Sequence, residues 1–419
     1  MSKLEELLHK FCPDGVEYKA LCDIGEIVRG NGLQKKDFTG NGVGCIHYGQ
    51  IYTYYGLSTN QTKSFVSPEL ADSLVKAYPG NLIIATTSEN VEDVCKCVVW
   101  LGNEPIVIGG HSAVLRHHEE PKYLAYYFQT PAFFQQKKKI VYGTKVIEMP
   151  TKKLAQVRIP IPPLPVQREI VRILDNFTEL TAELTAELTA ELTARKKQYE
   201  FYREKLLAPD NFHSTIKWCT IAELCHVSRG KVISKEYINS HRGMYPVYSS
   251  QTENDGILGM IDEYDYDGEY ITWTTDGANA GTVFLRSGKF NITNVCGLLK
   301  PKTDHTDIRY LYYALSIRAG SHVNRGMGNP KLMSNAMTKI QIPLPPLTIQ
   351  KRIAHILDNF DSICSDLNIG LPAEIEARRK QYAYYRDKLL TFPEAGATIL
   401  TDRQTDRQTD RQTDRQTDR

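Results

Sequence analysis

Residues 159–180 read IPIPPLPVQREIVRILDNFTEL, and residues 342–363 read IPLPPLTIQKRIAHILDNFDSI. Twelve of these 22 positions are identical, at a constant offset of 183 residues. The same offset relates residues 195–207 (RKKQYEFYREKLL) to residues 378–390 (RRKQYAYYRDKLL), with nine of 13 positions identical. The chain therefore contains one block twice, without a gap inside it, and this internal duplication organises the fold.

Each copy of the block predicts an extended, proline-rich entry followed by a long helix. The prolines within residues 160–165 block helix continuation, although such a stretch can also be a ligand for a proline-recognition module. Apolar residues then recur at three- and four-residue steps from Ile170 to Leu184, which is typical of an amphipathic helix. We predict a helix over residues 167–207, about 60 Å long and typical of a coiled coil.

The second copy predicts a helix over residues 349–390, with a kink or break at Gly370-Leu371-Pro372. The first helix leads from one globular part to the next, so the second returns if it packs on the first. The N-terminal segment from Leu4 to Gly15 resembles the linker after the first helix, at residues 205–210. We therefore expect it near the end of the second helix.

The segments that precede the blocks are weakly similar to each other. Residues 18–30 and 218–230 both end in Arg-Gly, and residues 78–87 (YPGNLIIATT) resemble residues 266–275 (YDGEYITWTT). The sequence thus predicts an α+β fold with two similar globular α/β domains, joined by two long antiparallel helices that form a coiled-coil spacer with pseudo-two-fold symmetry. We place the globular domains at residues 1–157 and 209–340, the repeated blocks at 158–208 and 341–392, and a tail at 393–419.

Two tracts have very low complexity. Residues 181–192 are three copies of Thr-Ala-Glu-Leu, in which Ala, Glu and Leu are strong helix formers. Each unit adds four residues, or ~6 Å of helix, and turns it about 40° beyond a whole turn, so gain or loss of a unit would shift the globular domains in discrete steps.

The second tract, residues 401–419, repeats Thr-Asp-Arg-Gln and is predicted to be disordered because it has no residue for a core. Its codons can be written as a repeated ACAG tetranucleotide. We hypothesise a slippage-prone tract that makes the end of the gene phase-variable.

Composition excludes several classes of protein. The chain has 419 residues, 41% of them hydrophobic, and no apolar run near the ~18 residues of a membrane span. The acidic start, Leu4-Glu5-Glu6, is unlike a signal peptide, and nine cysteines without a CxxC pair suggest reduced thiols, so we expect a cytoplasmic protein. A net charge of +2 means that any DNA affinity has to come from local patches.

Sequence motifs for catalysis are absent. There is no phosphate-binding P-loop and no Gly-rich dinucleotide or methyl-donor fingerprint. Asn329-Pro330-Lys331-Leu332 lacks the second proline and the aromatic of an amino-methyltransferase motif, and the two halves of Pro13-Asp14…Glu17-Tyr18-Lys19 are too close together for a nuclease. His111, His117 and His118 are candidate metal ligands, but a polar loop is favoured. We expect no catalytic, cofactor or metal site.

Binding chemistry remains, because cations contact phosphates and Arg, Asn, Ser and Thr read base edges. For any single residue, a solvated surface charge or a plain turn is an equal alternative. The residues that we predict to contact DNA are Arg29, Lys35, Lys36, Thr86, Thr87, Ser88, Asn90 and Lys145 in the first domain and Arg229, Lys231, Lys235, Thr274, Thr275, Asn279, Arg325, Asn329 and Lys331 in the second.

The duplicated Pro-Leu-x-x-Gln-x-x-Ile stretch with Leu-Asp a few residues on resembles the specificity subunit of type I restriction–modification systems. The Thr-Ala-Glu-Leu run is similar to a repeat in some members, and the resemblance extends to about Pro393. It implies that each globular domain is a target recognition domain for one half of a split, asymmetric DNA target. The chain itself would be non-catalytic.

The resemblance also implies partners. Two modification subunits would carry the adenine N6-methyltransferase site with S-adenosylmethionine, and restriction subunits would use ATP and Mg²⁺. The residues that it assigns to the spacer helices and partner docking are Gln167, Ile170, Leu174, Phe177, Leu184, Leu188, Gln350, Ile353, Leu357 and Phe360. The alternatives are a coiled-coil scaffold without DNA recognition, an adhesin, and a self-contained modifying enzyme.

Overall fold

The computed structural model describes residues 2–208, 216–326, 328–365 and 369–396. The predicted disordered tract at residues 401–419 lies outside this range. The chain divides into two compact units, of which unit 1 contains residues 1–184 and 377–419 and unit 2 contains residues 185–376. In the part of the chain that the structure describes, no helix is both long and apolar enough to cross a membrane.

Helix α8 (Leu164–Leu207) begins in unit 1 and ends in unit 2. It follows strand β13 (Arg158–Pro160), and Pro165 is tolerated in its first turn because no intrahelical N–H bond is needed there. The Thr-Ala-Glu-Leu repeats are helical throughout, with the Thr189 hydroxyl donating to the carbonyl of Thr185 four residues earlier. The predicted proline-rich entry and long helix are confirmed.

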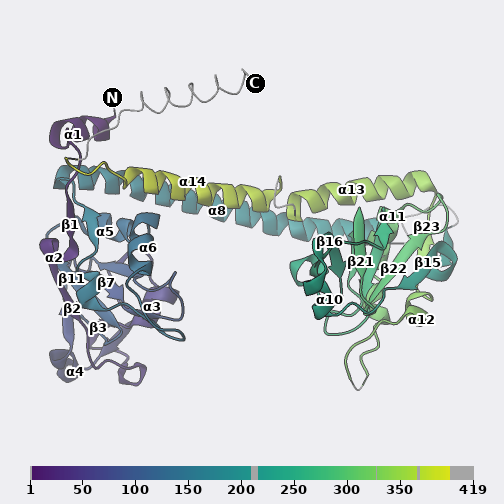
Figure 1. Ribbon diagram of the computed structural model, residues 1–419, viewed down its shortest axis with the longest axis horizontal. Coiled ribbons are helices and arrows are strands. Elements are labelled where there is room, and N and C mark those ends of the chain that lie inside the picture. Colours follow the sequence, from purple (N-terminus) through teal and green to yellow (C-terminus); the bar gives the residue numbers. More distant parts are fainter. Residues whose placement is uncertain (1, 209–215, 327, 366–368, 397–419) are drawn as a thin grey trace. The chain divides into compact units, whose positions relative to one another are not determined.

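The second block forms two helices, α13 (Leu347–Ser365) and α14 (Leu371–Leu389), so the predicted break is confirmed. In unit 1, α14 lies along α8 (Figure 1), with Phe177 stacked on Tyr385 and Thr178 Oγ1 2.9 Å from Tyr382 Oη. Numbering rises on one helix as it falls on the other, so this pair is antiparallel, as predicted.

In unit 2, α13 packs on the last turns of α8. The Phe360 ring lies 5.6 Å from Tyr202 and 6.3 Å from Tyr199, measured between centroids. Each unit thus contains its own segment of paired helices.

The globular part of unit 1 is built on a five-stranded sheet with the strand order β2-β11-β7-β9-β4 and a four-stranded sheet with the order β5-β3-β10-β6. The bounds of the first are β2 Gly25–Arg29, β11 Ser112–His117, β7 Leu82–Ala85, β9 Cys97–Trp100 and β4 Ser58–Thr59, and those of the second are β5 Ser64–Val66, β3 Val43–Ile46, β10 Ile106–Ile108 and β6 Val75–Ala77. Two small ribbons, β1-β13 and β8-β12, complete it, with β1 at Tyr18–Ala20, β8 at Thr87–Ser88 and β12 at Ile147–Glu148.

In its described residues, unit 2 repeats this plan with fewer strands. Its sheets have the orders β15-β22-β19-β20 and β17-β16-β21-β18, and β14 pairs with β23 as β1 pairs with β13. The bounds are β14 Lys217–Thr220, β15 Cys225–Arg229, β16 Arg242–Tyr248, β17 Ile257–Ile261, β18 Tyr266–Asp267, β19 Tyr270–Thr274, β20 Val283–Arg286, β21 Lys289–Ile292, β22 Cys296–Pro301 and β23 Gln341–Leu344.

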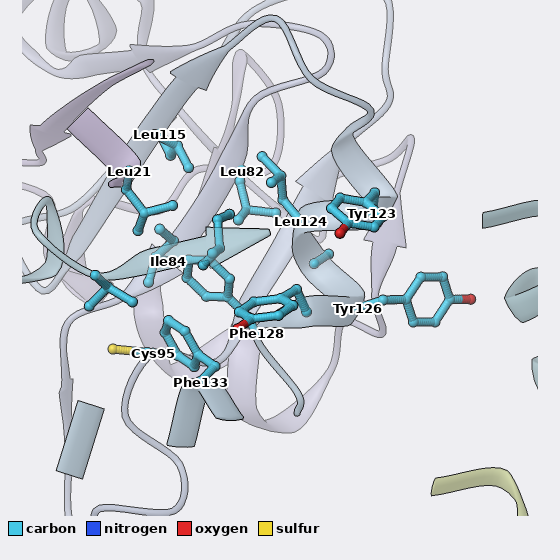
Figure 2. Close-up of a cluster of buried hydrophobic side chains, with 14 of the residues drawn as sticks. Leu21, Leu82, Ile84, Cys95, Leu115, Tyr123, Leu124, Tyr126, Phe128 and Phe133 are labelled. Atoms are coloured by element: carbon cyan, nitrogen blue, oxygen red, sulfur yellow. The ribbon is translucent and has the colours of Figure 1, made fainter. Parts of the chain in front are cut away.

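The main core of unit 1 lies between the five-stranded sheet and helix α5 (Pro121–Tyr127). Figure 2 shows Leu82, Ile84 and Leu115 of the sheet facing Leu124, Phe128 and Phe133, all of which are buried. The Tyr126 ring points away from this cluster, and its hydroxyl donates to Asp175 on α8 at 2.8 Å. Burial is the main cause that raises the pKa of this phenol, which keeps it protonated as a donor.

A buried amide joins each domain to its helix. Gln167 is fully buried, accepts the Glu120 N–H at 3.0 Å and donates to the Pro162 carbonyl at 2.6 Å and to Glu119 at 2.6 Å. Its equivalent at an offset of 183, Gln350, makes matching contacts in unit 2 with the Asp307 N–H and the carbonyls of His305 and Pro345.

The tyrosine contacts repeat as well. On α11 (Ile308–Ser316), Tyr313 donates to Asp358 at 2.8 Å as Tyr126 does to Asp175, and Tyr310 donates to the Pro343 carbonyl. Asp175 and Asp358 belong to the Leu-Asp of the duplicated stretch, whereas the tyrosines that bind them carry no signal in the sequence.

Burial divides the ten residues assigned to the spacer helices and partner docking, all of which lie on α8 or α13. Six of them are at most 5% exposed, so they pack the helices on their own domains and a docking role is wrong for them: Gln167, Ile170, Leu174, Gln350, Ile353 and Leu357. The other four, Phe177, Leu184, Leu188 and Phe360, are partly exposed.

The N-terminal segment lies where the sequence predicts it. Leu4 and Leu8 of α1 (Lys3–Phe11) line one cavity with Leu389 at the end of α14. Beside this cavity, Val16 forms a parallel β-bridge with Glu394.

We predict that Gln167→Ala lowers the free energy of unfolding of unit 1 by about 2–3 kcal/mol, because the Glu120 N–H and the Pro162 carbonyl lose a buried partner. Hydrogen exchange of the full chain during thermal unfolding, read out in peptides from unit 1, would measure this change in the free energy of unfolding. Gln135→Ala, at an exposed position of α6 (Pro131–Lys138), is the control. Equal effects of the two substitutions would contradict the prediction.

Candidate nucleic-acid interface

In unit 1, an arginine and a glutamate meet at the end of the five-stranded sheet. Arg29 ends strand β2, and its Nη1 lies 2.9 Å from Glu148 Oε1 while its Nε donates to the Gly110 carbonyl. Glu148 is paired with Thr87 across the β8-β12 ribbon. Three segments far apart in sequence thus place polar side chains at one end of the sheet.

An exposed lysine lies at the turn that leads into this ribbon. Tyr142 and Glu148 exchange two backbone hydrogen bonds, and Lys145 is exposed in the turn between them. Gly143 has a φ of 111°, and a Cβ there would lie 1.9 Å from the Val146 carbonyl oxygen, so the tight turn requires glycine. The adjacent Glu148 carboxylate raises the pKa of the exposed Tyr142 phenol.

Unit 2 has a corresponding cluster. Arg229 ends β15, and its Nη2 donates to Thr275 Oγ1 at 2.9 Å and lies 3.9 Å from Asp276 Oδ2. Lys331 pairs with Asp276 through its backbone, and its Nζ lies 3.6 Å from Asp276 Oδ1. Two cations therefore surround one carboxylate.

Backbone hydrogen bonds define which residues correspond. The Thr86 N–H donates to His111 and the Thr86 carbonyl accepts from Met149, while Thr275 makes the same two bonds with Val295 and Leu332. Thr86 is therefore equivalent to Thr275, Thr87 to Asp276 and Glu148 to Lys331. The sequence alignment of residues 78–87 with 266–275 is wrong by one residue here, because weak similarity does not define strand register.

The structure brings together part of the predicted set. Arg29, Thr87 and Ser88 gather in unit 1, where Lys145 is exposed in the turn that leads into the ribbon. In unit 2, Arg229 and Lys331 gather around Asp276, beside the buried Thr275. Exposed outside these contacts are Lys35 and Lys36 on η1 (Lys35–Asp37), Lys235 at the start of α10 (Lys235–Ser240), and Arg325 and Asn329 before Lys331.

Other predicted residues have structural roles. Thr86, Thr274 and Thr275 are 0% exposed, so the predicted base contacts of these three side chains are wrong. Lys231 forms ion pairs with Asp265 and Glu263. The amides of the remaining two serve loop contacts, Asn90 with Asp93 and Asn279 with Thr252.

The basic run at residues 137–139 also differs from its appearance in the sequence. Lys137 is 4% exposed, and its ammonium donates to the carbonyls of Glu92 and Val94, so it stabilises the fold.

A cluster of tilted rings that the sequence pattern does not reveal adjoins the unit 1 cluster. The Tyr48 ring on α3 (Tyr48–Thr53) lies 4.5 Å from the His47 ring and 4.9 Å from the His111 ring. His111 Nδ1 lies 3.1 Å from Thr87 Oγ1. Burial, Lys35 and His111 lower the pKa of His47, which favours the neutral ring.

The candidate metal ligands do not converge. His111 is bound to Thr87, and burial lowers the pKa of His117 to about 4. Among the residues that the structure describes, no three His, Cys, Asp or Glu side chains are grouped to hold a metal ion. The clusters instead offer guanidinium and ammonium groups, which bind phosphates, and hydroxyl and carboxylate groups, which can hydrogen-bond to base edges. This is the chemistry of nucleic-acid contact.

Comparisons with known proteins agree with this chemistry. Residues 13–194 and 214–377 each match the family model of the type I restriction modification DNA specificity domain. Over 238 residues, the chain is 45% identical to a Mycoplasma pneumoniae protein named as type I specificity subunit S.MpnORF615P, covering 55% of this chain and 92% of the relative. It is also 45% identical over 204 residues to the specificity subunit of the type I restriction enzyme MpnII of the same organism, covering 47% of this chain and 62% of that protein.

Two solved structures share the fold. The HsdS subunit from Thermoanaerobacter tengcongensis matches with a TM-score of 0.55 and 16% identity, covering 91% of this chain and 97% of that one. A chain from a study of complex assembly and conformational transition of the type I R-M system matches with a TM-score of 0.65 and 17% identity, covering 90% and 98%.

We predict that Lys145→Ala and Lys331→Ala each weaken binding of duplex DNA about equally across sequences, and that each lowers the slope of log affinity against log salt by about one. Titrations of the full chain at several salt concentrations would measure the slope. Lys10→Ala, on α1, is the control. An unchanged slope in both variants would show that these lysines contact no phosphate.

Proposed function

The chain belongs to the type I restriction–modification DNA specificity family, and we propose that it is the non-catalytic specificity subunit of such a system. Each unit reads one half of a split DNA target. One observation carries the proposal: the backbone arrangement occurs twice. In both units, equivalent strand ends present an arginine beside polar and charged side chains.

The two halves of the target should differ. The same strand positions carry Thr87 and Glu148 in unit 1 but Asp276 and Lys331 in unit 2. Because the hydrogen-bonding groups and their charges differ, the preferred bases should differ as well, which makes the full site asymmetric.

We assign the spacing between the half-sites to the paired helices. Helix α8 passes through both units, and the Thr-Ala-Glu-Leu repeats occupy its middle. Helix length then defines how many base pairs lie between the two contacts, with DNA bending as a further contribution.

Partner subunits complete the proposal. Two copies of an adenine N6-methyltransferase subunit would bring S-adenosylmethionine, and restriction subunits would bring ATP and Mg²⁺; this chain would bind none of them. Phe201 on α8 and Tyr384 on α14 are equivalent at the 183-residue offset and are 58% and 61% exposed. Aromatic side chains exposed at equivalent positions suit two copies of one partner. A protein-binding scaffold without DNA recognition is the alternative.

Deletion of this gene, in cells that retain the neighbouring modification gene, tests the function. We expect a genome-wide map of N6-methyladenine to lose one split, asymmetric motif. Complementation with the full chain should restore it. If no motif changes although the modification subunit co-purifies with the chain, the scaffold alternative is supported.

Removal of residues 185–188, one Thr-Ala-Glu-Leu unit, tests the spacer. It shortens the helix by ~6 Å, so the methylated motif should keep both half-sites and lose one or two base pairs between them. Substituting Thr185, Glu187 and Leu188 by Ala keeps the length of the helix and is the control. Loss of a half-site, or an unchanged gap in the shortened variant, would contradict a spacer role.

A further inference from the structure

Arg29 and Arg229 are equivalent residues, and each is held by a carboxylate that comes from a different place in the fold. Strand pairing aligns Ala113 with Arg29 and Gly297 with Arg229, each one residue after the equivalent positions Ser112 and Cys296. The two arginines therefore end the same strand of the two units.

The carboxylates are not equivalent to each other. Glu148, which binds Arg29, occupies the position of Lys331 in unit 2. Asp276, which binds Arg229, occupies the position of Thr87 in unit 1. Each unit thus pairs its arginine with an acid, although the acid has moved from one strand of the ribbon to the other.

From this exchange we infer that Glu148 and Asp276 are positioning residues, which hold Arg29 and Arg229 in the orientation that reads a base. The inference rests on the proposed function. A guanidinium discriminates guanine when two of its N–H donors meet the base edge in a fixed plane, and a freely rotating side chain contacts phosphates without discrimination.

The contacts leave donors for this purpose. Arg29 uses Nη1 for Glu148 and Nε for the Gly110 carbonyl, so Nη2 keeps its donors among the described residues. Arg229 uses Nη2 for Thr275 and Asp276, and its Nε is buried, while within the described residues its Nη1 makes one contact, 3.9 Å from the Met333 sulfur. The arginines are 46% and 29% exposed, so a duplex can reach them.

A purely electrostatic role and a positioning role of the two carboxylates predict opposite changes in DNA binding when the carboxylate is removed. A carboxylate that acted only by its charge would repel DNA, so its removal would strengthen binding to every sequence. A positioning carboxylate improves discrimination, so its removal leaves non-specific binding unchanged or stronger and weakens specific binding.

The test uses the full chain co-purified with its modification subunit, and duplexes of the motif with single changes in each half. Arg29→Ala first identifies the half that unit 1 reads. Glu148→Gln should then reduce discrimination in that half roughly ten-fold and leave the other half unchanged. Asp276→Asn should do the reverse. Glu89→Gln, which removes an exposed charge just after Ser88, is the matched control.

Introducing the unit 2 side chains at the equivalent positions of unit 1 tests whether base discrimination can be restored. Glu148→Lys alone places a cation beside Arg29 and should abolish base preference in that half. The double substitution Thr87→Asp with Glu148→Lys copies Asp276 and Lys331, and it should restore a sharp preference, whether or not the preferred base is the same.

The outcomes separate the inference from the proposed function. If the wild-type complex binds all duplexes equally, both fail. If the wild-type complex discriminates but Glu148→Gln behaves like Glu89→Gln, or if the double substitution is no sharper than Glu148→Lys, the positioning role is overturned while the specificity function stands.

Discussion

The buried amides of Gln167 and Gln350 fix each globular domain on its helix. Each side chain satisfies a backbone N–H at the start of a domain helix and a carbonyl in the proline-rich entry. Because buried backbone groups without partners are strongly destabilising, the entry, the spacer helix and the domain helix must fold together. This requirement explains why a glutamine stands between apolar helix positions in both copies of the block.

The glutamine contacts keep the backbone arrangement of the two units the same, while the side chains at the strand ends differ between them. Backbone hydrogen bonds around Thr86 and Thr275 are the same in both units, but the side chains beside them differ in charge and length. Backbone pairing places few constraints on side chains at the end of a sheet, where packing does not restrict their size. A duplicated fold can thus acquire two different sets of polar side chains at its strand ends without loss of its core.

The sequence predicted the architecture well because duplication, proline position and helical periodicity are local signals. It placed α8, the break before α14 and the N-terminal segment correctly. It failed where tertiary contacts decide: Lys137 looks like a surface cation and is buried, and Glu148 and Asp276 carry no local signal for the arginines that they bind. The one-residue error at Thr86 has the same origin, since strand register depends on partners distant in sequence.

The contacts that fix α8 on the two globular domains also explain where the Thr-Ala-Glu-Leu repeats lie along the helix. The contacts that anchor α8 to unit 1 extend to Thr178, which binds Tyr126 and Tyr382, and those in unit 2 begin at Tyr199. The Thr-Ala-Glu-Leu units at residues 181–192 lie between these anchors, where their leucines are only half-buried and no residue is bound to a globular domain in the described contacts. Length can therefore change there without disturbing either anchor. A four-residue insertion within residues 164–178 would move Gln167 or Asp175 out of reach of its partners. Under the proposed function, changes in half-site spacing are therefore restricted to the middle of the helix.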